Sequence, residues 1–441
     1  MSVDQRTRPA RADLIAAATV VGLFAVAAVV GGILHGLGRP VYAGAPPLLA
    51  QWLPHVGPGT PFAVLVAVLV WWRGPELAAR MSWRPLLALS YAGAVAWTLS
   101  LALIDGWQRG VADRLTTEHE YLHEVSGITD IPATLAVFTT RILDFQPDSW
   151  ATHVSAHPPG ALLVFVWLDR AGLGGGAWAA VLCILTASLV AVAVPQTVRS
   201  LGTGAAARAV VPFVVLFPGA VWSGVSADGL FAGVTATGVA LLAYGVTRGR
   251  AVVAFAGGAV LAFGCYLSYG LVLMAALALG VVVAAGPRWR TAGWAFAGAV
   301  PVVAAFTIAG FSWLTGYHLL IERYYQGIAS DRAYGYWVWA NLSLMAVCAG
   351  PAAAVILRRA VTAVRPRARN ATWVLPLAAA AAIVAADLSG YSKAEVERIW
   401  LPFAVWLMAG AALLPPADRR VWLAVQAVVA LTVNHLVLTV W

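Results

Sequence analysis

The chain has 441 residues, of which 61% are hydrophobic and only 11% are charged. Soluble domains carry roughly 25% charged residues, so this composition excludes an ordinary soluble protein. The net charge of +9 does not indicate a nucleic-acid-binding protein, because the arginines lie in short segments between long apolar runs. The sequence predicts an all-α protein that crosses a membrane several times.

Apolar runs of about 18–20 residues recur along the chain, and a run of this length can cross a hydrocarbon core of about 30 Å. We predict about thirteen spans, at residues 14–34, 62–72, 85–104, 177–196, 209–222, 226–245, 251–266, 269–286, 292–314, 334–357, 372–388, 400–414 and 421–440. The apolar segment at residues 160–169 is too short to cross, and we interpret it as a half-inserted helix. The whole chain, residues 1–441, is predicted to form a single transmembrane helical bundle.

Arginines occupy alternate connections between these spans. They are Arg199, Arg208, Arg248, Arg250, Arg288, Arg290, Arg358, Arg359, Arg365, Arg367, Arg369, Arg419 and Arg420. Basic loops face the cytoplasm, as does the basic N-terminus at residues 1–12, so the opposite connections face outward. We therefore predict a multi-pass protein of the inner (plasma) membrane whose long polar interval, residues 105–160, is extracytoplasmic.

We call this polar interval, residues 105–160, the acidic loop. Its ionisable residues include Asp105, Glu118, His119, Glu120, His123, Glu124, Asp130, His153 and His157. An amphipathic helix in TTEHEYLHEV would place Glu120 and Glu124 on one face, with Glu118 near its start. Carboxylates that lie close together and partly out of water have raised pKa values, which suits a general base. The alternative is a solvated amphipathic helix on the membrane surface.

The four histidines of the acidic loop do not have the spacing of a closed zinc site. Carboxylates are better ligands for a hard divalent cation, which can also bridge phosphate groups. A divalent cation, Mg²⁺ or Mn²⁺, is therefore left open as a cofactor, and no other cofactor is expected.

The HPPG motif at residues 157–160 predicts where the half-inserted helix begins, because proline is favoured in the first turn of a helix. The positive end of this helix would attract an anion such as phosphate, with His157 and His153 beside it. The alternative is a plain helix-start turn. Asp228, at the outward end of the span at 226–245, is interpreted as a helix N-cap, a site residue, or both.

Two later outward segments combine charged and aromatic groups. Their candidate binding residues are Arg323, Tyr324, Lys393, Glu397 and Arg398. Arginine makes multidentate contacts to phosphate and lysine supplies a point charge, so the basic members could bind a phosphate-bearing substrate. The alternative for Arg398 is a side chain that reaches from a helix end towards water. Tyr269, in CYLSYG, is either an interfacial aromatic residue or a ligand.

Three of these features, in this order, resemble the GT-C superfamily of integral-membrane glycosyltransferases. TTEHEYLHEV is similar to the family's acidic motif, HPPG to its H/K-PP motif, and Pro218, Ser226 and Asp228 to its Pro–Ser–Asp pattern. The resemblance covers roughly residues 85–290 and extends to actinobacterial arabinosyl- and mannosyltransferases. Two features differ from the family pattern: the large loop follows the third predicted span, and glutamates stand where many members have aspartate.

The resemblance implies an inverting enzyme that transfers a sugar from a polyprenyl-phosphate donor to a glycan or lipid acceptor of the cell envelope. One carboxylate among Glu118, Glu120 and Asp105 would deprotonate the acceptor hydroxyl. The residues implied to bind substrate are His153, His157, Asp228, Tyr269, Arg323, Tyr324, Lys393, Glu397 and Arg398.

Two other functions remain open. A lipid or polyol transporter, or a flippase, would also carry charges within a membrane, although the internal repeats common in transporters are not found in this sequence. An O-antigen-ligase-like enzyme would also use lipid-linked sugars, but we would expect a larger late outer loop.

Overall fold

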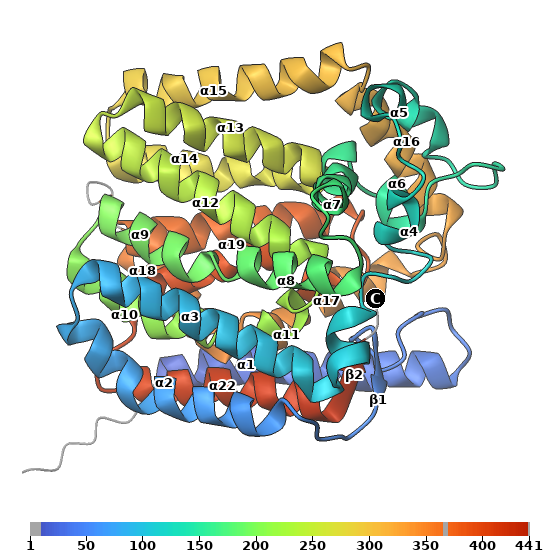
Figure 1. The fold of residues 1–441 in the computed structure, drawn as a ribbon. Helices are drawn as coiled ribbons and strands as arrows, with labels where there is room; N and C mark the ends of the chain where they lie inside the picture. The colour runs from blue at the N-terminus through green and yellow to red at the C-terminus, as the bar shows by residue number, and fades with distance from the viewer. Residues whose placement is uncertain (1–9, 365–368, 440–441) are drawn as a thin grey trace, which may run out of the picture.

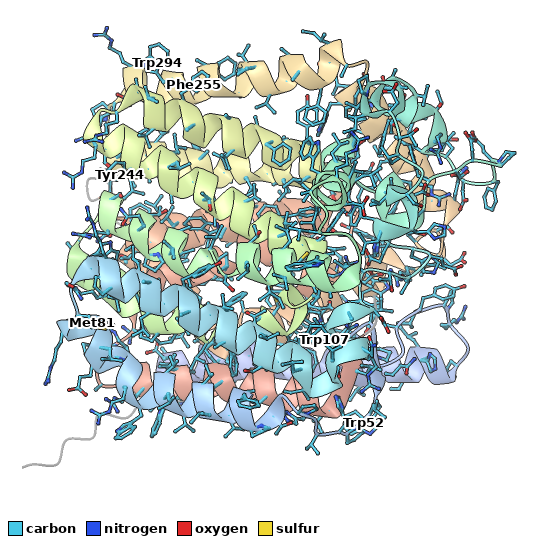
Figure 2. The ribbon with its side chains drawn as sticks, in the orientation of Figure 1. Trp52, Met81, Trp107, Tyr244, Phe255 and Trp294 are labelled. Atoms are coloured by element: carbon cyan, nitrogen blue, oxygen red, sulfur yellow. The ribbon has the colours of Figure 1, made fainter. Side chains whose placement is uncertain are left out.

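The computed structural model describes residues 10–364 and 369–439. Its long helices lie side by side, while short helices, turns and a two-stranded sheet gather at one end of the bundle (Figure 1). Figure 2 shows Trp52 and Trp107 at this end, and Met81 and Tyr244 at the opposite end. The predicted cytoplasmic residues 1–9 and the predicted loop residues 365–368 lie outside the described residues.

Helices predominate along the whole chain, and η marks short segments of 3-10 or π-helix. The chain begins with α1 (Arg11–Gly36), β1 (Ala50–Trp52), α2 (Thr60–Arg80) and α3 (Trp83–Ala102). The acidic loop and its continuation form η1 (Leu103–Asp105), η2 (Gln108–Ala112), α4 (Leu122–Val125), α5 (Ile131–Val137), η3 (Phe138–Arg141), α6 (Thr152–Ser155) and α7 (Pro159–Arg170).

The central part of the bundle follows directly. It consists of α8 (Gly176–Ala187), α9 (Val190–Leu201), α10 (Gly204–Val215), α11 (Ala220–Ser223), α12 (Ala227–Arg248), α13 (Ala251–Leu267), η4 (Tyr269–Leu273), α14 (Met274–Ala285) and α15 (Trp289–Ile308). The last part consists of α16 (Trp313–Gln326), α17 (Tyr334–Cys348), α18 (Pro351–Ala363), α19 (Ala371–Ser389), α20 (Val396–Ile399), α21 (Leu401–Ala404), η5 (Val405–Leu413), α22 (Arg419–Leu436) and β2 (Val437–Thr439).

Seven described helical segments are long and apolar enough to cross a membrane, which makes the chain an all-α polytopic membrane protein. They are Arg11–Gly36, Thr60–Arg80, Trp83–Asp105, Gly176–Leu201, Ala227–Arg248, Trp289–Ile308 and Ala371–Ser389. The predicted count of about thirteen crossings is not confirmed, because several predicted spans form shorter helices. The helix α10, for example, has 12 residues and ends before Pro218 and Gly219.

The helix α12 lies at the centre of the bundle. In the described structure, 72% of its most apolar window is buried, compared with 11% for α1 and for α15. A side chain at Gly257 of α13 would meet the backbone nitrogen of Leu242 at 2.6 Å, so α12 and α13 pack backbone against backbone. The peripheral α1 and α15 instead leave apolar side chains exposed.

The start of α12 corrects the interpretation of Asp228 as a helix cap. Ser226 is the N-cap residue, and its Oγ accepts a hydrogen bond from the N–H of Gly229 at 3.2 Å. Asp228 lies in the first turn, where the positive end of the helix stabilises a carboxylate. Its side chain is therefore available to pair with another element.

The acidic loop contains only short helices. The predicted amphipathic helix carrying both Glu120 and Glu124 is wrong, because α4 has four residues and Glu120 precedes it. Gly127 follows soon after α4, and Asp130 caps the separate helix α5. By contrast, the prediction that a helix begins at HPPG is confirmed, since Pro159 is the first residue of α7.

The segment predicted as a span at 334–357 is broken. Its two halves, α17 and α18, are bent by 105° at a short interruption that contains Gly350. Gly350 has a φ of 77°, and Pro351 begins α18, so the backbone cannot continue as one helix. The amide of Gln426 on α22 donates to the carbonyl of Ala349 at 2.8 Å, which satisfies one backbone group freed by the break.

Candidate functional site

Glu120 and His153 form a buried pair in the acidic loop. The side chain of Glu120 is 2% exposed, and its Oε1 lies 2.8 Å from Nδ1 of His153. The N–H of His153 donates to the carbonyl of His119 at 2.9 Å, which joins the two parts of the loop. The other oxygen of Glu120, Oε2, has no hydrogen-bond partner in the described part of the protein. Because an unpaired buried oxygen is costly, this atom is suited to accept a proton or hydrogen bond from a ligand.

Tyr121 and His157 lie beside this pair. The hydroxyl oxygen of Tyr121 is 2.7 Å from Nδ1 of His157, and the same nitrogen is 2.8 Å from the carbonyl oxygen of His153. Tyr121 stacks on Phe165 of α7, and His157 meets Phe231 of α12 edge to face. Burial lowers the pKa of His157 to about 4, so its imidazole is neutral near pH 7. These two residues therefore supply hydrogen bonds without a net charge.

Arg398 of α20 is the centre of a second set of contacts. Its Nη1 donates to Oδ2 of Asp228 at 2.7 Å, and its Nη2 donates to Oε2 of Glu395 at 2.9 Å. The other oxygen of Glu395 accepts from Arg332 at 3.3 Å. Burial alone would lower the pKa of Arg398, but the two carboxylates outweigh burial and raise it. Arg398 is therefore a buried, paired cation and not a side chain that reaches into water.

The two sets of contacts interact electrostatically. Burial raises the pKa of Tyr121, and the charge of Glu120 adds to this shift and to the rise in the pKa of Arg398. The charge of Asp228 partly opposes the lowering of the pKa of His157 by burial. The acidic loop, α12 and the turn into α20 thus bring their ionisable side chains to one place. We call this group the charge cluster and define it as Glu120, His153, His157, Asp228, Glu395 and Arg398.

Glu397 lies in the same short helix as Arg398 and is 2% exposed. Burial raises the pKa of its carboxyl group to about 7. Its Oε2 has no hydrogen-bond partner among the described residues. A carboxyl group with such a pKa can release or accept a proton near neutral pH.

Asn341 of α17 holds the turn that carries these acids. Its Nδ2 donates to Oδ1 of Asp387 at 3.0 Å and to the carbonyl of Ser392 at 2.8 Å, while its Oδ1 accepts from the N–H of Ala394 at 3.2 Å. Ala394 and Glu395 have φ angles of 70° and 63°, in the left-handed region that is unfavourable for side-chain-bearing residues. The contacts of Asn341 therefore maintain a strained backbone beside the charge cluster.

Lys393 and Tyr324 lie on this turn and next to it. The N–H of Lys393 donates to the hydroxyl of Tyr324 at 2.9 Å, and its Nζ donates to the carbonyl of Ala329 at 2.9 Å. Nζ also lies 5.2 Å from the ring centroid of Tyr325. Arg332 donates to the carbonyl of Lys393 at 2.8 Å, which connects these residues to Glu395 and the charge cluster.

Glu118 occupies a different environment from Glu120. Its side chain is 80% exposed, and its ion-pair partner is the exposed His119 at 3.8 Å. An exposed carboxylate remains hydrated. Glu118 therefore lacks the partial desolvation on which the prediction of a general base depends.

The side chain of Asp105 is buried, and both of its carboxylate oxygens are paired. Its Oδ1 lies 2.7 Å from Nε2 of His55, and its Oδ2 lies 3.2 Å from Nη2 of Arg114. Arg114 also donates to the carbonyl of Thr439 on β2 at 2.7 Å. Asp105 therefore ties the start of the acidic loop to the β1–β2 sheet, in which Ala50 pairs with Thr439.

Tyr269 and Arg323 make their contacts through α16. The ring of Tyr269 is buried and lies 5.2 Å from that of Trp313. Arg323 forms an ion pair with Asp144 at 2.5 Å, and the N–H of Asp144 donates to Gln326 at 2.8 Å. The contacts of Asp144 anchor α16 to the acidic loop, whereas Tyr269 packs against α16 from η4. None of these contacts includes a member of the charge cluster.

The predicted divalent cation would need the carboxylates of the charge cluster as its ligands. In the described part of the chain, no group of three or more His, Cys, Asp or Glu side chains is arranged to hold a metal ion. Glu120 is paired with His153, while Asp228 and Glu395 are both paired with Arg398. Carboxylates paired in this way do not provide the shared oxygen ligands that Mg²⁺ or Mn²⁺ requires.

A cavity of about 270 Å³ lies against the acidic loop and α7. Leu122, His123 and Asp169 contribute to its wall, together with Phe165. Phe165 stacks on Tyr121 with ring centroids 5.3 Å apart. Phe165 therefore lies between this cavity and Tyr121, the residue that contacts His157.

Sequence reasoning did not select Tyr121, Glu395, Arg332 or Asn341. Glu395 precedes Arg398 by three residues, a spacing that allows an ion pair on one helical turn and could have identified it. Asn341 is a polar amide inside a predicted span, which is also a recognised signal of function. Arg332 gave no local signal, since its partner Glu395 lies 63 positions away.

No known protein family, curated protein or solved structure matches this chain. Fold and site together define a polytopic helical membrane protein with a buried charge cluster near one end of its bundle. The charge cluster is therefore the basis for assigning a function.

Proposed function

We propose that this protein is a membrane glycosyltransferase of the GT-C type that uses a polyprenyl-phosphate sugar donor. The observation that carries the proposal is the state of Glu120. One carboxylate oxygen is bound by His153, the other is buried and has no partner among the described residues, and the group interacts with the cation of Arg398. A base beside a cation suits a reaction in which a hydroxyl loses a proton while a phosphate group leaves.

In the proposed reaction, Oε2 of Glu120 takes the proton of the acceptor hydroxyl while the hydroxyl oxygen attacks the anomeric carbon. The bond from that carbon to the phosphate oxygen breaks, and polyprenyl phosphate leaves with the bonding electrons. Attack opposite to the leaving group inverts the anomeric centre. His153 acts as a positioning residue, because it holds Oε1 and leaves Oε2 for the acceptor.

Arg398 is proposed to stabilise the leaving phosphate. Asp228 and Glu395 fix its two terminal nitrogens, while its Nε has no hydrogen-bond partner among the described residues. Burial strengthens a hydrogen bond from this Nε to a developing negative charge. His157 contributes a neutral imidazole, and Glu397 contributes a carboxyl group that titrates near neutrality.

The membrane location fits an amphipathic donor. The polyprenyl chain would lie among the apolar helix faces, with its phosphate at the end of the bundle that carries the acidic loop. We propose that this end is extracytoplasmic and that the acceptor, a glycan or lipid of the cell envelope, enters from there. Lys393 and Tyr324, next to the charge cluster, are proposed to contact the sugar or phosphate groups.

One observation favours a transporter instead. The helices α17 and α18 form a broken span with a 105° bend, and transporters commonly bind their substrates at broken helices. In a transporter, the charge cluster would bind its cargo without breaking a bond. A measurement of product formation distinguishes the two functions.

The experiment uses the purified full-length protein with labelled polyprenyl-phosphate mannose and polyprenyl-phosphate arabinofuranose, each mixed with a short glycan acceptor. The proposal predicts a labelled glycan product and release of polyprenyl phosphate. Parallel samples with EDTA, and with Mg²⁺ or Mn²⁺ added back, test whether transfer depends on a divalent cation. Saturable donor binding and movement across proteoliposomes, with no product from either donor, would establish transport and overturn the proposal.

A further inference from the structure

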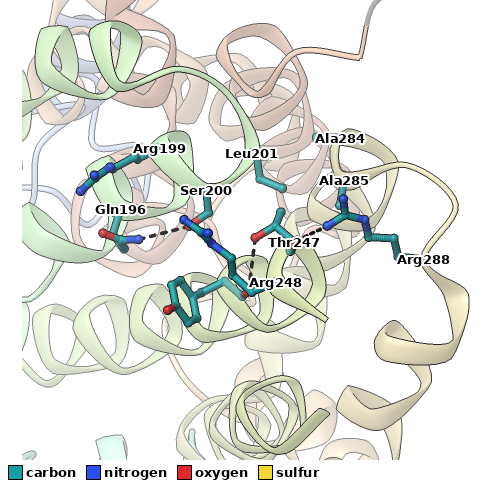
Figure 3. A pocket seen from close by; sticks show the side chains of 10 residues that line it. Gln196, Arg199, Ser200, Leu201, Thr247, Arg248, Ala284, Ala285 and Arg288 are labelled. Atoms are coloured by element: carbon teal, nitrogen blue, oxygen red, sulfur yellow. Dashed lines mark hydrogen bonds between the residues drawn. The ribbon is translucent and has the colours of Figure 1, made fainter. Parts of the chain in front are cut away.

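A second concave site lies at the end of the bundle opposite to the acidic loop. It is a cavity of about 500 Å³ between the last turns of α9, α12 and α14. Figure 3 shows Arg199, Arg248 and Arg288 around it, one from each of three separate segments. Tyr244, which also lines the cavity, marks this end of the molecule in Figure 2.

The positive charge of this cavity is not balanced by the described residues that line it. Among the described residues that line it there are three arginines and no carboxylate. Within residues 10–364 and 369–439, no ion pair involves Arg199, Arg248 or Arg288. Their contacts are instead with an aromatic ring or backbone oxygens: Arg199 lies 4.6 Å from the ring of Trp83, and Arg288 donates to the carbonyl of Val246 at 3.2 Å. Helix C-termini attract cations, but three arginines that line one cavity also suit an anion.

The rest of the wall is amphipathic. Gln196 and Thr247 add polar groups, and Gln196 is held by Trp83 at 2.9 Å. Leu201, Ala284 and Ala285 make an apolar side. An inorganic anion would need only the polar side, whereas a phospholipid uses both.

The cavity also adjoins the lipid-facing surface. Arg288 directly precedes α15, whose most apolar window is only 11% buried, and Trp289 is 69% exposed at the start of that helix. Exposed tryptophan is typical of the membrane–water interface, where phospholipid phosphates lie. The exposed apolar side of α15 therefore begins next to the cavity and could hold the acyl chains of a lipid whose headgroup lies there.

We propose that this cavity binds the headgroup of an anionic phospholipid, with its phosphate against Arg199, Arg248 and Arg288. Basic pockets between membrane helices bind such headgroups in general. The site does not depend on the proposed glycosyltransferase activity, because it lies at the other end of the bundle.

The test uses delipidated full-length protein and native mass spectrometry with cardiolipin, phosphatidylglycerol or phosphatidylcholine. The double variant Arg199→Gln, Arg248→Gln removes two charges and spares Arg288, which bonds to backbone carbonyls. At roughly 1 kcal/mol per basic side chain, binding of the anionic lipids should weaken about thirtyfold. The matched control Arg73→Gln, Arg80→Gln removes two exposed charges from the end of α2 and should retain wild-type binding.

Three results would overturn the proposal. They are equal binding of phosphatidylcholine, equal loss in the control variant, and pyrophosphate binding as tightly as the lipids.

A thermal melt shows whether each variant is folded. Anionic lipid should raise the Tm of the wild type and of the control, and the single variant Arg248→Gln should already reduce this increase, since its side chain is exposed.

Discussion

The carboxylate of Asp228 lies 2.7 Å from the guanidinium of Arg398, although the two residues are 170 positions apart in the chain. Asp228 belongs to the first turn of the most central helix, α12, and Arg398 belongs to a short helix that follows a strained turn. The pair therefore joins the rigid core of the bundle to the segment that carries Glu395 and Glu397.

Breaking this pair should affect both stability and activity. Asp228→Asn leaves the buried guanidinium of Arg398 with one carboxylate fewer, and losing one partner of a buried pair costs about 3–5 kcal/mol. We expect a clear fall in Tm in detergent and a loss of sugar transfer. The control Asp148→Asn changes a carboxylate that is 67% exposed, and it should leave both properties unchanged. Equal Tm values for the two variants would show that the buried pair does not stabilise the fold.

Glu397 should make stability depend on pH. Burial raises its pKa from 4.5 to about 7, so the folded protein holds a proton that the unfolded chain has already lost between these values. Its contribution is therefore fully present below about pH 4.5 and is lost as the pH rises through about 7, amounting to roughly 3 kcal/mol. Glu397→Gln should flatten the fall in Tm between pH 5 and pH 8, at about those values. An unchanged pH profile in this variant would mean that Glu397 is not the titrating group.

Asn341 should control the shape of the turn beside the charge cluster. Asn341→Ala removes three hydrogen bonds to Asp387, Ser392 and Ala394, and it leaves buried partners unpaired at about 1–3 kcal/mol each. We expect a lower Tm and a reduced kcat, because Glu395 and Arg398 are displaced. The neighbouring Ser343→Ala removes only a local hydrogen bond to Ala340 and serves as the control. If both variants keep wild-type kcat, the turn does not position the charge cluster.

Asp105 should be structural. Asp105→Asn weakens its contacts with His55 and Arg114, which connect the acidic loop to β2, so the main effect should be on Tm. Transfer measured on the folded fraction should stay within a few-fold of wild type. A loss of turnover of about 100-fold without a change in Tm would instead make Asp105 the general base.

The sequence predicted well what depends on local composition. The apolar runs identified the membrane helices, and the two prolines of HPPG marked the first turn of α7. The short α4 was not predicted, because the spacing of Glu120 and Glu124 suits a longer helix while the chain turns soon after Val125. The predicted number of spans is not confirmed, because apolar composition does not fix the length of a helix, as the 12 residues of α10 show.

The candidate site was only partly predictable. Short motifs identified Glu120, His157, Asp228 and Arg398, because charged residues in an apolar chain are conspicuous. Which of them meet is decided by the packing of the acidic loop against α12 and α20, which no local pattern encodes. The same packing distinguishes the buried Glu120 from Glu118, only two residues earlier, whose side chain is 80% exposed.

This contrast provides the most direct test of the proposed function. Sugar transfer from the polyprenyl-phosphate donor is measured for Glu120→Gln and Glu118→Gln, which make the same chemical change two residues apart, after both have shown the wild-type Tm. Loss of a general base should reduce kcat about 10²–10⁴-fold in Glu120→Gln, whereas Glu118→Gln should transfer at close to the wild-type rate. Retained turnover in Glu120→Gln, or an equal loss in both variants, would contradict the assignment of Glu120 as the catalytic base.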